Sequence, residues 1–214
     1  MMGRRTILWG VPTFLYLIFF IWYTDLGGPL RPAEIASFSD QMAQNGLDPE
    51  GVDSIRRFME SDSGRQFFMV NVIDMNENPP NVEGARPGAS ADELMALYME
   101  HMYGELLKRA SHPVVYGQAV FPALDLVGIE GAESWDAGAL FRYRSRRTFM
   151  EVVSNPATLG RHEFKVAALE KTIAYPIESP VFIGDPRLLL GLILLSSTAI
   201  LDIAFYGRRG PGKS

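Results

Sequence analysis

Five polar residues on apolar segments in the middle of the chain have side chains that could bind a small molecule. Asn71 lies in FFMVNVIDM, Tyr116 and Gln118 lie in HPVVYGQAV, and Arg142 and Arg144 lie in GALFRYRS. The planar guanidinium groups suit a carboxylate or a phosphate, and the amides and the phenol suit the orientation of a bound molecule. We predict a ligand-binding role for these five residues. No carboxylate lies plainly among them as a general base, so they do not form a complete catalytic set.

The three histidines do not form a recognisable metal site. His101, in YMEHMY, lies beside the apolar stripe of an expected helix, whereas His112 and His162 belong to other segments. Neither H-x-x-x-H nor H-E-x-x-H occurs, and the chain has no cysteine. His101 is the best candidate for acid–base work or haem ligation, although a histidine at the edge of an apolar face is more often structural. The sequence identifies no cofactor and leaves open whether the protein is an enzyme.

The segments that carry these residues are predicted to be elements of one α+β domain. We expect strands over 67–75, 113–121, 135–144 and 173–177, and helices over 90–110, 145–154 and 160–171. The resulting order, β-α-β-β-α-β, is the ferredoxin-like arrangement.

Alternation along the strands predicts which face of the sheet carries the polar residues, because successive side chains point to opposite faces. We assign the most apolar positions to the face that carries the helices: Phe68, Val70, Val72, Val115, Ala119, Phe121, Ala137, Ala139, Phe141 and Tyr143. The reverse face then collects the five polar residues. That face is either solvated, closed by a second subunit or part of a ligand cavity.

Two apolar segments near the ends of the chain are predicted to span a membrane. Residues 6–23 contain no charge, and residues 188–206 contain one ionisable side chain, that of Asp202, for which we expect a structural role. A secretory signal is the alternative for the first segment, but no A-x-A-like site follows it, so we expect an uncleaved anchor. Basic residues at both chain tips place both termini in the cytoplasm and the domain between the spans outside it, in the periplasm of a Gram-negative cell.

These elements divide the chain into five parts. We expect an anchor over 1–24, a helical connector over 25–66, the α+β domain over 67–180, a second span over 186–207 and a basic cytoplasmic tail over 208–214. The formal net charge is −5, but the residues between 24 and 187 include 15 basic and 24 acidic side chains, a net charge of −9. Nucleic acid selects basic surfaces, so we exclude it as a partner.

Several segments resemble a known protein family. MVNVIDM, HPVVYGQAV, SWDAGALFRYRSRRTFMEVVSNP and HEFKVAALEKT are similar to segments of an uncharacterised family of small dimeric α+β barrel proteins. This resemblance implies ferredoxin-like subunits whose sheets pack face to face in a homodimer, with Asn71, Gln118 and Arg142 lining the barrel. The wider superfamily includes haem-degrading monooxygenases, isomerases and haem peroxidases, so the fold alone does not choose a reaction.

Three functions fit these predictions. The first is a membrane-tethered domain outside the cytoplasm that binds a small molecule or supports a membrane complex, acting as a homodimer or as a subunit of that complex. The second is an isomerase or a monooxygenase-like enzyme that acts on a small apolar or anionic substrate. The third is a purely structural subunit of a membrane assembly.

Overall fold

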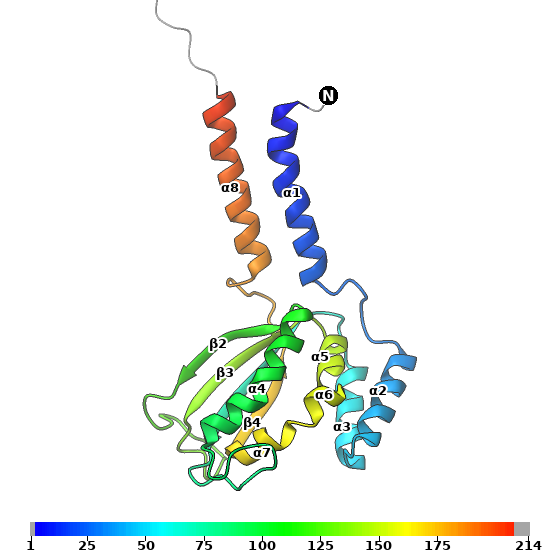
Figure 1. Cartoon of the computed structure of the whole chain (residues 1–214). Coiled ribbons are helices and arrows are strands. Elements are labelled where there is room, and N and C mark those ends of the chain that lie inside the picture. Colours follow the sequence, from blue (N-terminus) through cyan, green and yellow to red (C-terminus); the bar gives the residue numbers. More distant parts are fainter. Residues whose placement is uncertain (1–2, 208–214) are drawn as a thin grey trace, which may run out of the picture. The chain divides into compact units, whose positions relative to one another are not determined.

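The computed structural model describes residues 3–207, with the side chains of all of them except residues 157 and 159. The described chain forms two units (Figure 1). One consists of the two ends of the chain, up to Thr24 and from Pro180 onwards, and the other is Asp25–Ser179. Residues 1–2 of the expected anchor and the expected basic tail at 208–214 lie outside the described residues.

The unit made from the chain ends consists of two long helices, α1 (Arg4–Tyr23) and α8 (Pro186–Tyr206). Both are long and apolar enough to cross a membrane, and little of either helix is buried within the protein. An apolar helix that the protein itself leaves uncovered is suited to a lipid environment.

Polar side chains join α1 to α8 at both ends of this helix pair. Arg5 donates hydrogen bonds from Nε and Nη2 to the two carboxylate oxygens of Asp202, at 2.7 and 2.6 Å. Near the other end of the pair, Arg187 Nη1 donates to Thr24 Oγ1 at 3.0 Å. A bidentate ion pair is the arrangement that best offsets the cost of charge in an apolar medium, so Asp202 has a structural role here.

The second unit begins with a helical hairpin, α2 (Pro32–Gln44) and α3 (Pro49–Glu60). Each helix opens with a proline, whose missing N–H is not needed in the first turn. Arg147 ties this hairpin and the preceding segment to the rest of the unit, because its guanidinium contacts Asp25 Oδ2 at 3.2 Å and Glu34 Oε1 at 2.7 Å.

The centre of this unit is a four-stranded antiparallel sheet with the strand order β2-β3-β1-β4. The elements that follow the hairpin are β1 (Phe67–Met75), α4 (Ala91–Lys108), β2 (His112–Gln118), β3 (Ala137–Tyr143), α5 (Arg146–Val153), α6 (Pro156–Leu159), α7 (His162–Ala168) and β4 (Leu169–Ile177). Helices α4 and α7 lie over one face of the sheet (Figure 1). The last strand begins four residues earlier than expected, since its pairing with β1 continues back to Leu169, opposite Met75.

The register between the strands contradicts the predicted sorting of the two faces. Asn71 of β1 lies opposite Ala139 of β3, whereas Phe68 lies opposite Arg142. Residues that oppose each other across an antiparallel pair share a face. The predicted helix-covered face is therefore wrong for β1 and β2, because Phe68 and Val115 lie on the opposite face from Ala139. The odd-numbered residues of β1, including Asn71, face the helices, and the even-numbered residues face away.

Candidate functional site

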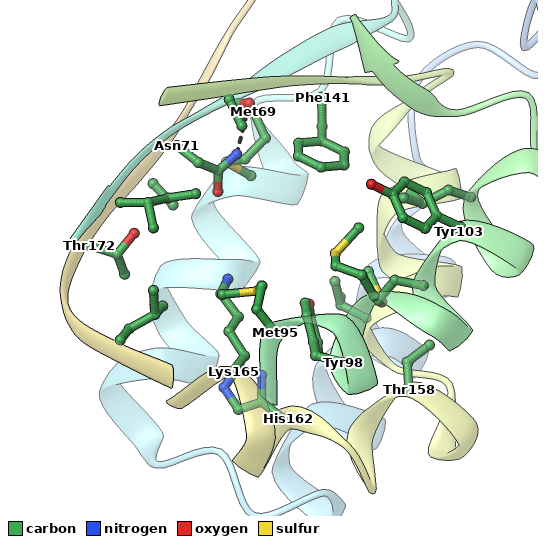
Figure 2. A pocket seen from close by; sticks show the side chains of 18 of the residues that line it. Met69, Asn71, Met95, Tyr98, Tyr103, Phe141, Thr158, His162, Lys165 and Thr172 are labelled. Carbon is green, nitrogen blue, oxygen red and sulfur yellow. Dashed lines mark hydrogen bonds between the residues drawn. The ribbon is translucent and has the colours of Figure 1, made fainter. Parts of the chain in front are cut away.

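A cavity of about 970 Å³ lies between the helix-covered face of the sheet and helices α4 and α7. This volume is near the upper end of the range for small-molecule sites, roughly 300–1,000 Å³. Figure 2 shows the open space, with the sheet on one side and the helices on the other. Its walls are mainly apolar and rich in methionine, and they include Met69, Ile73, Met95, Met99, Met102 and Phe141.

The cavity exists because small side chains lie on the sheet where large ones would fill the space. Asn71 has Ala139 on one neighbouring strand and Ala174 on the other. All three residues line the cavity. The methionines of α4 opposite them are unbranched and flexible, so this wall can adapt to the shape of a bound molecule.

Asn71 places a hydrogen-bonding group on the apolar floor of the cavity. Its Nδ2 donates to the backbone oxygen of Met69 at 3.1 Å, which fixes the orientation of the amide. The amide oxygen points into the open space (Figure 2), and no described residue donates a hydrogen bond to it. An amide held in this way can bind and orient a polar group of a ligand.

Two more of the predicted binding residues line the same cavity. Tyr116 lies opposite Ala139, and Gln118 lies opposite Ala137, so both side chains share the face of Asn71. Because β2 is an edge strand, these side chains reach solvent, and Tyr116 is 67% exposed. They form part of the rim of the cavity, whereas Asn71 lies on its floor.

The structure does not bring Arg142 and Arg144 to this cavity. Arg142 lies on the opposite face of the sheet and is fully buried, with Nε donating to Gln66 Oε1 at 2.8 Å and Nη1 to the Ala110 oxygen at 2.5 Å. Arg144 follows the end of β3, and its Nε donates to Thr148 Oγ1 at 3.4 Å. The prediction that these arginines share one face with Asn71 is wrong, because the side chain at position 142 points away from the face on which residue 139 lies.

The histidine selected from the sequence also lies elsewhere. His101 is exposed on α4 and does not line the cavity. Two residues of α7 that were not selected, His162 and Lys165, do line it. Their spacing of three residues puts both on one side of a helix, a weak signal that does not tell which side faces the sheet.

Burial perturbs the titratable groups at this end of the cavity. It lowers the pKa of Lys165 and raises the pKa of Tyr98, over whose ring the Lys165 amine lies at 5.8 Å from the centroid. Partial burial, together with the charge of Lys165, lowers the pKa of His162 and so favours its neutral form. Among the described residues, no group of three histidine, aspartate or glutamate side chains could hold a metal ion.

Two crystal structures of RPA0582, a protein of unknown function from Rhodopseudomonas palustris, have a similar fold. One has a TM-score of 0.52 and 18% sequence identity, and the match covers 64% of this chain and 96% of that chain. The methylated protein has a TM-score of 0.52 and 20% identity, with 65% and 96% covered. The sequence matches no protein-family model and no curated protein. At these identities the likeness shows a common α+β fold and nothing about a shared ligand or reaction.

Proposed function

We propose that this protein is a membrane-tethered domain that binds a small apolar molecule in the cavity between the sheet and α4. The observation that carries this proposal is the cavity itself, about 970 Å³ in volume, with the Asn71 amide set among small residues on its floor. A mainly apolar pocket with a few convergent polar groups is the usual form of a ligand site.

Binding of a fluorescent apolar probe tests this proposal. The full-length protein is reconstituted without detergent in lipid particles that a scaffold peptide stabilises, and it is titrated with N-phenyl-1-naphthylamine. The same lipid particles without protein serve as the blank. We expect saturable binding of one probe per chain, because the cavity is apolar and large enough for the phenyl and naphthyl groups of one probe molecule. A signal equal to that of the empty particles would overturn the proposal.

A ferredoxin-like subunit that pairs with a second copy is part of this proposal. The strand order β2-β3-β1-β4 supports the ferredoxin-like topology. The face of the sheet that points away from the helices supports the pairing, because apolar side chains remain exposed on its outer strands: Val115, Ile173, Tyr175 and Ile177. A second copy packed sheet to sheet would cover this surface, so the native mass should be twice that of one chain.

We also propose that the domain lies outside the cytoplasm, with both chain ends inside. Arg4 and Arg5 at the start of α1 support this orientation. Because the natural chain has no cysteine, single cysteines report topology cleanly. On cells with a permeabilised outer envelope, an impermeant maleimide should label Val120→Cys, a position that is 97% exposed. It should label Gly3→Cys only after lysis, and the reverse pattern would contradict the orientation.

An enzyme is the second candidate, and His162 and Lys165 favour it because they bring proton-exchanging groups to the cavity. The reaction would be that of an isomerase or a monooxygenase-like enzyme on a small apolar or anionic substrate.

A role as an accessory subunit of a membrane complex draws support from the loop between β2 and β3, where Val120, Leu124 and Val127 are exposed. Copurification with a stable assembly would favour this role over the isolated homodimer.

A further inference from the structure

Lys165 brings a positive charge into the cavity, and no carboxylate within residues 3–207 forms an ion pair with it. Its side chain extends from α7, and the amine points into the open space (Figure 2). Among the residues that the structure describes, none accepts a hydrogen bond from this amine, and its contact is the face of the Tyr98 ring. A ring on one side of an ammonium group leaves its other N–H donors unsatisfied.

This absence of a counter-ion sets Lys165 apart from the two other lysines that the structure describes. Lys108 pairs with Glu105 at 2.8 Å, and Lys171 pairs with Asp74 at 3.3 Å. A partly buried charge without a partner is costly. The lowered pKa of Lys165, caused by burial, is the expected consequence of this cost. An anion bound beside Lys165 would offset this free-energy cost.

The charges around the cavity limit the kind of anion that fits. Three carboxylates, those of Asp92, Glu100 and Asp136, lie along the same lining. Arg161 Nη1 contacts Glu100 at 3.4 Å, and Asp136 accepts a hydrogen bond from the Met75 backbone, so these two acids have other partners than Lys165. With a single cation on α7 and this acidic lining, a doubly charged phosphate monoester is disfavoured relative to a singly charged carboxylate.

We propose that the natural ligand is an apolar molecule with one carboxylate, and that Lys165 binds this carboxylate while the methionine-rich wall takes the apolar body. The inference rests on the proposed ligand-binding function and names the chemical class of the ligand. Asn71 then binds a second polar group, should the ligand carry one, on the floor of the cavity.

Competition between two matched molecules tests this assignment. Decanoate and decanol, which share their alkyl chain and differ in charge, displace N-phenyl-1-naphthylamine from the full-length protein in peptide-stabilised particles at pH 7.5. Lys165→Met should lower the affinity for decanoate about 10- to 100-fold, which corresponds to the loss of one charge-assisted hydrogen bond. The same substitution should change the affinity for decanol less than about twofold. Lys165→Arg keeps the charge and should retain decanoate binding within about threefold.

Lys171→Met is the matched control, because it removes the same charge from β4 at a position outside the cavity. Lys171→Met should leave the affinities for decanoate and decanol unchanged. If Lys165→Met fails to fold, Lys165→Gln makes the same comparison with a polar side chain. Unchanged displacement by decanoate in Lys165→Met or Lys165→Gln, with the probe still bound, would overturn this inference and leave the proposed function standing. Failure of the wild-type protein to bind the probe at all would instead contradict the proposed function.

Discussion

Arg142→Ala should lower the free energy of unfolding by about 3 kcal/mol, the scale expected when a buried, hydrogen-bonded charged group is removed. The guanidinium is fully buried and bonds to Gln66 Oε1 and to the backbone oxygen of Ala110. Ala110 has a φ of 50°, an uncommon backbone conformation for a residue with a side chain, at the turn between α4 and β2. Without Arg142, the carbonyl of this turn loses its donor and a void opens beside it.

Urea unfolding of the full-length protein in a mild detergent measures this effect. In a Trp9→Phe/Trp22→Phe background, the fluorescence of Trp135 reports on the unit that contains the sheet. Arg56→Ala is the matched control, since it removes an exposed arginine from α3, and it should cost less than about 1 kcal/mol. Equal losses for the two variants would contradict the structural role assigned to Arg142.

Ala139→Phe should weaken binding of N-phenyl-1-naphthylamine by about 100-fold or more, because it places an aromatic ring in the middle of the cavity. Ala139 lies directly opposite Asn71 and lines the cavity. The fold should persist, since the new ring enters open space rather than a packed core. Probe titration measures the affinity, and circular dichroism confirms that the variant is folded.

Gly138→Ala provides the control for Ala139→Phe. Residue 138 is the neighbour of Ala139 in β3, so its side chain points to the other face of the sheet. A methyl group there would lie 4.0 Å from the Asn71 backbone oxygen, an ordinary contact distance. Probe affinity should stay within about twofold of wild type. Wild-type affinity in Ala139→Phe as well would show that the probe binds elsewhere.

The elements set by local bonding could be predicted closely from the sequence. Asp48 and Pro49 mark the start of α3, and the Asp48 carboxylate accepts a hydrogen bond from Gly51 N at 2.7 Å. Ser90 and Glu93 open α4 with reciprocal bonds between side chain and backbone. Such bonds join residues three apart, so the sequence alone contains both partners.

The pairing of the strands could not be predicted in this way. Alternation sorts the residues of one strand into two sets, but it does not tell which set of β1 meets which set of β3, about seventy positions away. The apolar character of the residues did not identify the helix-covered face. Asn71 lies on that face, where the cavity accommodates its amide. Apolar residues such as Ile173 and Tyr175 are exposed on the other face. The position of Lys165 at the cavity depends on the same long-range packing of α7.

Native mass spectrometry of the wild-type protein and Ala139→Phe, each gently extracted from the same membranes, tests ligand binding in the cavity most directly. For the wild type we expect a homodimer that carries additional small-molecule mass, identifiable after release as an apolar carboxylate. In Ala139→Phe the dimer should persist and the additional mass should disappear. Bare chains in both samples, or the same additional mass in both, would contradict the proposal that this cavity holds the ligand.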